Sequence, residues 1–324
     1  MSRLRDPLVI GDVRLPNRIW FPPVARDLAE TDGSVTDENV EAYRRVASGG
    51  VGTVVVEHCF VDPDGRFSPR QIGVDRDACV PGLKRLARVI RDNGAVPLLQ
   101  VSHAGSKTLC ARRLAPSATM LPGDTDPPEE LRADEIPQIV SSFAHAVGRA
   151  REAGFSGVEI HGAHGFLLSE FFSPLTNHRV DGYGGGLRER ARLALEVVEA
   201  ARRSAREDFL IGFRLGADDD MDGGLTPVDA VHIAGWLQAA GVNIISVSGG
   251  LCGSAPRRWS ERQGFFVAQA EMVKRSVTLP VVGVGGITDA AYARVIIERG
   301  RVDLVAVGRK LVEDPEWARR ALEQ

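Results

Sequence analysis

Two histidines separated by two residues, His161 and His164, directly follow a short apolar run near the middle of the chain. Polar side chains also stand at or just after the ends of comparable runs, at His58, Gln100 and Arg214. Imidazoles can bind a metal ion, relay a proton or donate hydrogen bonds to a substrate oxygen. Histidines that only bond to the backbone would fit the same spacing. These residues by themselves leave all four interpretations open.

Glycine turns beside an arginine are the second group suited to chemistry. Gly285 and Gly286 end one apolar run, and Gly308 with Arg309 ends the next. Backbone N–H groups in such turns bind phosphate, and a guanidinium adds a bidentate contact. Tight connections between a strand and a helix would also need these glycines. Two such turns in consecutive segments, one with an arginine, favour a phosphate site.

Eight short apolar or β-branched runs must position these residues. Most are continuous rather than alternating, which is typical of parallel strands buried on both faces. The stretches between them carry apolar residues at helical spacing, and glycine follows four of them at the position where helices stop. The runs are 19–24, 53–57, 96–101, 157–160, 210–214, 244–248, 281–284 and 304–307, and the clearest helices are 81–92, 134–153, 187–203, 226–240 and 289–299.

Eight strands alternating with helices predict an α/β fold, a (β/α)₈ TIM barrel. The rival open sheet would place its glycine-rich fingerprint after the first strand, whereas here it follows the seventh. Residues 8–10 and 13–15 around Gly11 predict a short hairpin that caps the barrel floor. No break in composition divides residues 1–324, so we expect a single domain. Its active site should lie at the carboxyl ends of the strands, where the polar residues stand.

Composition argues against several classes of protein. The 324 residues are 44% hydrophobic and 26% charged, which is typical of a globular chain and not of a disordered one. A net charge of −3 gives no reason to expect nucleic acid or an anionic membrane as partner. No apolar stretch is long enough to span a membrane or serve as a signal peptide. The four cysteines are scattered without a C-x-x-C pair, so we expect a reduced, cytoplasmic protein.

Two segments in the middle of the chain resemble the old yellow enzyme family of flavin oxidoreductases. They read Gly-Val-Glu-Ile-His-Gly-Ala-His-Gly-Phe-Leu from 157 and Ser-Pro-Leu-Thr-Asn-His-Arg-Val-Asp-Gly-Tyr-Gly-Gly from 173. Further pieces agree in order, at 16–23, 49–57, 100–105, 115–117, 214 and 303–309. The resemblance implies a short barrel that binds FMN alone, takes electrons from NADPH or NADH and reduces a small molecule. Members of this family often form oligomers.

The resemblance also implies a role for each matching residue. His161 and His164 would donate hydrogen bonds to a substrate carbonyl and so polarise a conjugated double bond for hydride from flavin N5. Gln100 would bond the flavin pyrimidine edge, and Arg214 would stabilise the anionic reduced ring near N1 and O2. The segment Asn177–Tyr183 would be structural. The remaining cofactor contacts would be the backbone of Pro22, Pro23, Val24, Ala25 and His58, and the phosphate group at Gly285, Gly286, Gly308 and Arg309.

Departures from the family pattern concern the substrate side. Phe166 stands where a tyrosine usually hands a proton to the α-carbon, and a phenyl ring cannot do so. Ala25 replaces a residue that usually bonds flavin O4. Arg26 and Asp27 occupy positions near a customary aromatic substrate contact. The loop 249–264 carries Arg257, Arg258 and Trp259, which would meet a substrate carboxylate or NADPH phosphates, or would form an exposed charged loop.

Phe166 leaves three outcomes open. Water or another side chain could supply the proton and leave reduction of the double bond intact. The enzyme could instead oxidise, isomerise or demethylate its substrate, for which that proton is not needed. The third outcome is a protein that binds FMN without catalysis. On the histidines alone, a metal-dependent barrel hydrolase also remains as an alternative, although we assign no metal ligands.

Overall fold

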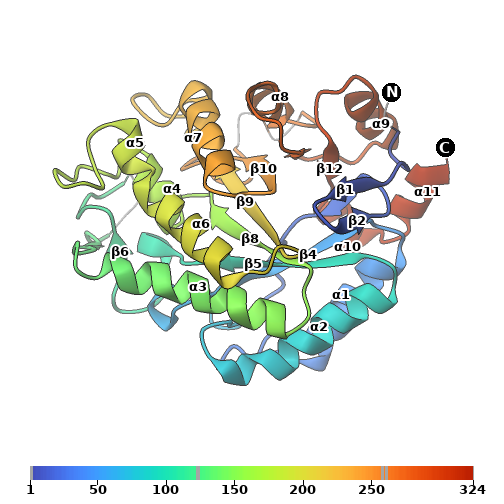
Figure 1. The fold of residues 1–324 in the computed structure, drawn as a ribbon, viewed down its shortest axis with the longest axis horizontal. Helices are drawn as coiled ribbons and strands as arrows, with labels where there is room; N and C mark the ends of the chain where they lie inside the picture. The colour runs from blue at the N-terminus through green and yellow to red at the C-terminus, as the bar shows by residue number, and fades with distance from the viewer. Residues whose placement is uncertain (1–2, 122–124, 257–258, 260–261, 324) are drawn as a thin grey trace.

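The fold is that of a computed structural model, which describes residues 3–121, 125–256, 259 and 262–323. Eight parallel strands close into a barrel in the order β10-β11-β12-β3-β4-β5-β8-β9 (Figure 1). This confirms the predicted (β/α)₈ barrel, and each predicted run contributes one strand. The strands are β3 (Ile19–Phe21), β4 (Thr53–Phe60), β5 (Val96–Ser102), β8 (Gly157–Gly162), β9 (Leu210–Gly216), β10 (Ile244–Ser248), β11 (Val281–Gly283) and β12 (Leu304–Ala306).

Helices surround the barrel, and four of them end at the glycines where the sequence predicted their ends. Gly94, Gly154, Gly241 and Gly300 all have positive φ, the conformation that glycine adopts without strain. The stretch predicted as one helix over 187–203 forms two, because the chain turns at Ala191. The helices are α1 (Asp37–Ser48), α2 (Val80–Asp92), α3 (Ile136–Glu152), α4 (Leu167–Phe172), α5 (Leu187–Arg190), α6 (Arg192–Ser204), α7 (Pro227–Ala239), α8 (Val267–Ser276), α9 (Ala290–Glu298), α10 (Arg309–Glu313) and α11 (Trp317–Glu323), with short 3₁₀ turns at Pro63–Gly65, Asp77–Cys79 and Gly105–Lys107.

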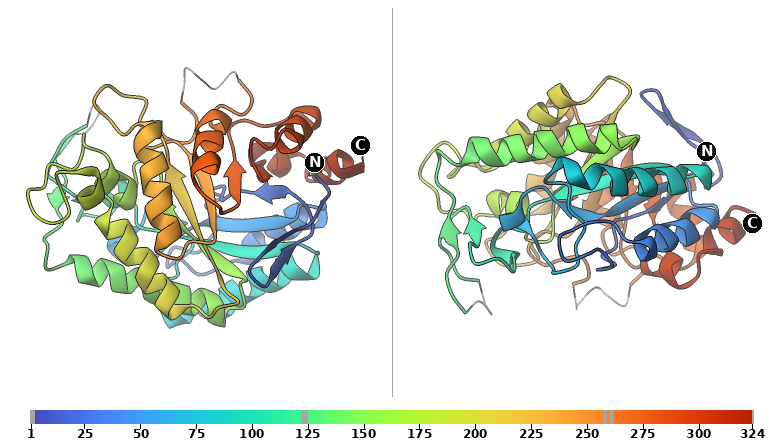
Figure 2. Two further views of the ribbon diagram at one scale, coloured as in Figure 1. Left: turned by 45° about the horizontal axis from the view of Figure 1, so that its top comes forward. Right: turned by 90° about the horizontal axis from the view of Figure 1, so that it is seen from below.

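A hairpin of β1 (Leu8–Ile10) and β2 (Val13–Leu15) closes the amino-terminal end of the barrel, as predicted. Ile10 and Leu15 pack against inward-facing side chains of the strands, such as Trp20 and Leu98, in one buried cluster. Figure 2 shows the hairpin at the same end as both chain termini. The floor is therefore sealed by apolar contacts.

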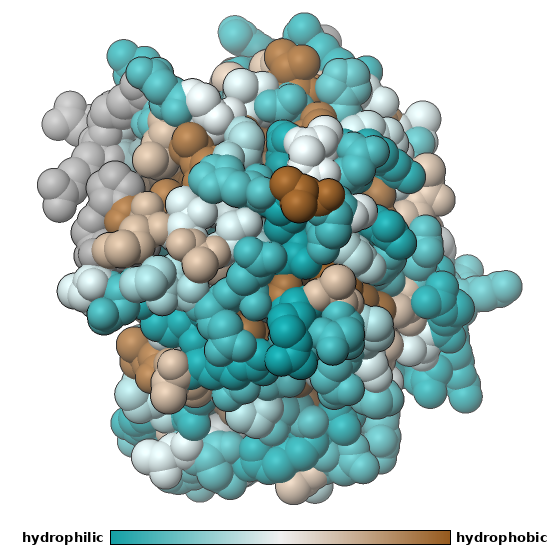
Figure 3. All heavy atoms as spheres, turned by 90° about the vertical axis from the view of Figure 1, so that its left-hand side faces the viewer, coloured by the Kyte–Doolittle hydropathy of each residue, from teal (hydrophilic) through white to brown (hydrophobic). Residues whose placement is uncertain are grey.

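The opposite end carries the loops that follow the carboxyl ends of the strands. A small parallel sheet of β6 (Leu114–Ala115) and β7 (Glu129–Glu130) lies there, beside α4 and α5 (Figure 1). Seen from that side, the surface is mostly hydrophilic with scattered apolar residues (Figure 3). Among the described residues, no helix is both long enough and apolar enough to cross a membrane.

Candidate active site

The carboxyl end of the barrel, called the mouth from here on, brings together side chains from four neighbouring strands. Gln100 and Glu159 face each other across β5 and β8, and His161 and Arg214 across β8 and β9. The Glu159 carboxylate accepts hydrogen bonds from Gln100 Nε2 at 2.7 Å and from Ser246 Oγ at 2.5 Å. Burial raises the pKa of Glu159, while the charge of Arg214 opposes the rise. The mouth thus contains a buried polar layer directly above the apolar floor.

His161 and His164 lie together at this mouth, with ring centroids 5.0 Å apart. His164 has a φ of 59°, a left-handed conformation that is uncommon outside glycine and is often found at functional sites. Burial, together with nearby cationic groups, lowers the pKa of both histidines well below the usual value. Both rings are therefore neutral at ordinary pH and present one N–H donor each.

Two buried nitrogen atoms of this site, one in the His161 ring and one in the neighbouring Arg214, have no hydrogen-bond partner among the described residues. They are Nδ1 of His161 and Nε of Arg214. Ser248 Oγ occupies the space between the second histidine and the arginine, 2.7 Å from His164 Nε2 and 3.3 Å from Arg214 Nη2. A buried guanidinium N–H without a partner is costly, so this site fits a bound group that carries acceptor atoms.

An aromatic cluster forms the wall next to the histidines. The Phe166 ring lies 4.7 Å from His161, 5.3 Å from Phe67 and 5.5 Å from His58, measured between centroids. Phe67 comes from the loop after β4 and was missed by reasoning from the sequence. No strand pattern or motif marks it. The wall provides an apolar, π-rich face beside His161.

A β-bulge in β4 decides which way its last residues point. The register against β5 shifts between Val56 and Cys59. The Glu57 side chain turns to α1, where Tyr43 Oη donates to its carboxylate at 3.3 Å. His58 turns inward to the aromatic wall, so its side chain, and not only its predicted backbone, reaches the mouth. Bulges often re-aim a side chain next to an active site.

Glu57 holds the segment after β3 that was predicted to line the flavin. Its carboxylate accepts the backbone N–H groups of Arg26 at 2.8 Å and of Asp27 at 3.4 Å. Burial raises the pKa of Glu57 to about 7, although these hydrogen bonds oppose the rise. Asp27 has a φ of 51° and pairs with Ser68. The segment is therefore fixed by its backbone.

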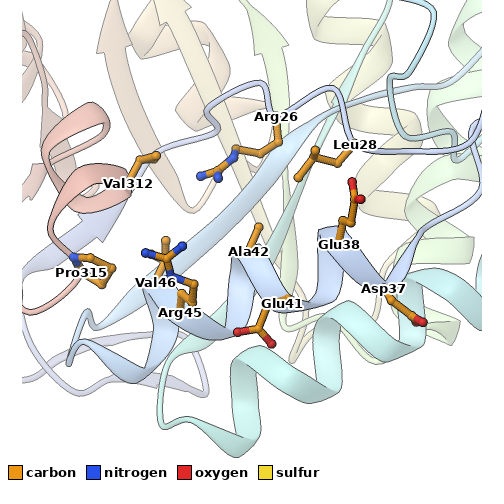
Figure 4. A pocket seen from close by; sticks show the side chains of 10 residues that line it. All are labelled: Arg26, Leu28, Asp37, Glu38, Glu41, Ala42, Arg45, Val46, Val312 and Pro315. Carbon is orange, nitrogen blue, oxygen red and sulfur yellow. The ribbon is translucent and has the colours of Figure 1, made fainter.

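The side chain of Arg26 does not reach the histidine pair. It extends into a hollow of about 470 Å³ outside the barrel, between α1 and the segment around Val312 and Pro315 (Figure 4). The backbone contact to Glu57 directs it outward. A contact between Arg26 and the substrate therefore stays a prediction. This hollow is not the site of the chemistry, because the partnerless polar atoms lie elsewhere.

The glycine turns after β11 and β12 have the geometry of the predicted phosphate site. Gly285 and Gly286 have φ of 125° and 61°. A Cβ at Gly285 would stand 2.6 Å from the backbone nitrogen of Phe265, so only glycine fits. Gly308 precedes α10, whose first residue, Arg309, is exposed. An exposed guanidinium beside the half-buried Gly286 and Gly308 is compatible with a bound phosphate group.

The remaining predicted residues lie farther from the histidines. Trp259 packs edge-on against Phe266, with centroids 5.8 Å apart, on the side of the glycine turns. Arg257 and Arg258 lie outside the described residues. In the segment 177–183, Asn177 bonds two backbone carbonyls and Arg179 bonds two more, which fits the structural role predicted for it. Within the described ranges, His, Cys, Asp and Glu side chains form no group of three that could hold a metal ion.

Comparison with known proteins gives consistent matches. The model of the NADH:flavin oxidoreductase / NADH oxidase family matches residues 3–324. The chain is 39% identical to the NADH oxidase of Thermoanaerobacter brockii over 97% of its own length, but spans only 50% of that relative. It is 35% identical to the NADPH dehydrogenase of Bacillus subtilis (strain 168), over 99% of this chain and 95% of the relative. The old yellow enzyme homologue from Zymomonas mobilis superposes with a TM-score of 0.86 at 25% identity, over 99% of this chain and 93% of that one.

Proposed function

The chain belongs to the NADH:flavin oxidoreductase / NADH oxidase family, and we propose that residues 1–324 form one FMN-binding barrel that uses NAD(P)H to reduce an activated carbon–carbon double bond. The observation that carries the proposal is the neutral pair His161 and His164 beside Arg214, whose Nε is buried without a partner. A small molecule with a carbonyl oxygen is the substrate that this pair would bind.

Several residues would hold FMN. Arg214 would direct its unpaired Nε–H to the pyrimidine edge of the ring, and Gln100 has an amide oxygen left after bonding Glu159. Gly285, Gly286, Gly308 and Arg309 would receive the phosphate. The backbone from Pro22 to Ala25 would lie along the ring. When bound, FMN supplies the hydride that it has received from NAD(P)H.

The two histidines would bind the substrate oxygen. Arg214 donates to Ser248 Oγ, and we propose that the serine hydroxyl in turn donates to His164 Nε2. That leaves the proton of neutral His164 on Nδ1, from where it can be donated to a ligand. His161 offers a second donor. Two fixed donors in a water-poor mouth stabilise the negative charge that develops on oxygen as hydride arrives at the β-carbon.

Phe166 limits the second half of the reaction. No hydroxyl stands there, so the proton for the α-carbon would come from water or another group. This observation also favours a second candidate on the same site, a flavin-dependent oxidation, isomerisation or demethylation that needs no such donor. Turnover of an enone with NAD(P)H under anaerobic conditions separates the two, because only the reductase consumes one NAD(P)H per double bond.

The test begins with the visible spectrum of the purified protein before and after anaerobic NADPH or NADH. A flavin spectrum that bleaches supports the proposal. A yellow protein that stays yellow supports the second candidate, and a colourless protein that FMN cannot reconstitute overturns both. Next, His161→Ala with His164→Ala should weaken phenol binding and enone turnover at least a hundredfold, roughly the value of two hydrogen bonds to an anionic oxygen. Loss of FMN instead would refute the assigned role.

A further inference from the structure

His58 is a third histidine of the mouth, and the bulge of β4 places it there. Its ring meets the rings of Phe67 and Phe166 edge-on, at 5.7 Å and 5.5 Å between centroids with interplanar angles of 86° and 73°. Phe166 in turn contacts His161. His58 and His161 thus flank one phenyl ring from two sides. The His58 side chain is held rigidly at the aromatic wall.

The contacts of Gln71 decide which nitrogen of His58 carries the proton. The Gln71 side-chain oxygen accepts the backbone N–H of Phe67 at 2.6 Å, which fixes the orientation of the amide. Gln71 Nε2 therefore faces His58, 2.7 Å from its carbonyl oxygen and 2.7 Å from its Nδ1. An amide nitrogen can only donate, so Nδ1 must accept. The proton of the neutral ring is then on Nε2.

The ring remains neutral because burial lowers the pKa of His58 to about 4, although the charge of Asp27 opposes this. The His58 side chain also faces the uncharged rings of Phe67 and Phe166 and the amide of Gln71, with His161 and His164 of the same mouth beyond them. Nε2 makes no hydrogen bond to the described residues. The other two polar atoms that face Gln71, Nδ1 and the carbonyl oxygen of His58, both accept hydrogen bonds from its amide nitrogen. A directed N–H donor therefore stands at the wall with nothing to bond.

Resting on the proposed function, we propose that His58 is a third hydrogen-bond donor of the substrate pocket and that the acceptor is a para-quinone, a planar ring with a carbonyl group at each end. His161 and His164 hold one oxygen, His58 Nε2–H holds the other, and the ring packs against Phe166 and Phe67. A substrate with one carbonyl would cover the N–H of His58 without giving it an acceptor, which costs binding energy.

The chemistry of a quinone also accounts for Phe166. One hydride from NAD(P)H, delivered through the proposed flavin, would add two electrons and one hydrogen to a ring carbon. That carbon then loses a proton as the ring becomes aromatic, and each oxygen takes up one proton. The net reaction consumes one proton from solvent and releases NAD(P)⁺. In the product both added hydrogens are on oxygen and none remains on carbon. A tyrosine that protonates an α-carbon is therefore not needed, whereas donors at both oxygens are.

The test uses a matched pair of non-reacting phenols on the oxidised holoenzyme. The pair is para-hydroxyacetophenone, which offers a carbonyl oxygen in addition to its phenolic oxygen, and para-ethylphenol, which offers the phenolic oxygen alone. We expect the wild type to prefer the ketone and His58→Phe, which keeps an aromatic ring but removes the N–H, to lose about tenfold of that preference, the value of one hydrogen bond. Comparing each variant with the wild type cancels the different acidity of the two phenols. An unchanged preference in His58→Phe overturns the proposal.

A second measurement keeps the proposal testable if His58→Phe does not fold. Nitrogen NMR of the wild-type protein reads the tautomer of His58, and a proton on Nδ1 overturns the assignment. In turnover, His58→Phe should lower kcat/KM for para-benzoquinone about tenfold more than it lowers kcat/KM for cyclohexenone; equal effects on both substrates would also overturn the proposal. Phenols that do not bind even to the wild type, or that bind equally well after His161→Ala with His164→Ala, count against the proposed function instead.

Discussion

The floor and the mouth of the barrel are built from the same strands but from opposite kinds of side chain. Leu98 of β5 and Ile244 of β10 face the sealed floor, and two residues further along each strand stand Gln100 and Ser246. At the floor every inward position adds apolar area removed from water. At the mouth the inward positions are polar. Within the described chain, buried atoms without partners occur at both ends, at His161 Nδ1 and Arg214 Nε in the mouth and at Trp20 Nε1 in the floor.

This difference separates the parts that stabilise the protein from the parts prepared for a ligand. Apolar burial stabilises the fold by roughly 25 cal/mol per Å². Buried polar atoms without partners cost free energy and are tolerated where a ligand completes them. The floor is therefore the place where a substitution changes stability, and the mouth the place where it changes chemistry.

The largest effect is expected at the floor. Trp20 is 1% exposed at the centre of the floor cluster, and Trp20→Ala should lower the free energy of unfolding by about 3–5 kcal/mol. Denaturant titration measures the loss. His161→Ala, at an equally buried position of the mouth, should cost less, because the imidazole removes less apolar area from water than the indole does. Equal losses would break the distinction between the two ends.

A pH dependence of stability should come from Glu57, which is buried between β4 and α1. The Glu57 pKa lies at about 7, above its ordinary value of 4.5, so the folded state holds this proton more tightly than the unfolded state. Glu57 therefore adds to the free energy of unfolding below pH 4.5. This contribution, at most about 3 kcal/mol, is lost as the pH rises through about 7. The unfolding free energy of the wild type minus that of Glu57→Gln should fall by this amount across the window. Glu129→Gln, at an exposed carboxyl whose pKa Arg112 lowers, should show the opposite sign.

A smaller, chemical effect should follow from restoring the hydroxyl at the wall. Phe166→Tyr supplies an acid beside the histidines and should raise enone turnover about tenfold, the low end for general acid catalysis. Steady-state kinetics with cyclohexenone measures it. Turnover of para-benzoquinone should not rise, because its protons go to oxygen. A gain with the quinone and none with the enone would contradict the assigned position.

The smallest effect is expected on the outer face of the floor. Val9 of the hairpin is 63% exposed, and Val9→Thr keeps a β-branched side chain. The change in unfolding free energy should stay within about 0.5 kcal/mol. Ile10→Thr, one residue further on and buried against the floor, is the matched control and should cost several times more. Similar costs would show that the hairpin does not seal the barrel.

Much of the fold could be predicted because it depends on local pattern. Continuous apolar runs predict strands covered on both faces, and the glycines after the helices adopt the left-handed conformation that they permit. The pair His161 and His164 could be placed at the mouth because residues at the carboxyl ends of parallel strands meet at one end of a barrel. The glycine turns after β11 and β12 follow from the same rule.

What the sequence by itself determined is therefore the barrel, its capped floor and the end at which the polar residues gather, since each follows from spacing along the chain. Only the tertiary structure decided which way the side chains of Arg26, Glu57 and His58 point. One extra residue in β4 reverses the facing of the residues that follow, and no residue type announces such a bulge. The donor at His58 Nε2 likewise depends on Gln71 and Phe67, whose contacts with it form only when the loop after β4 folds back on the mouth.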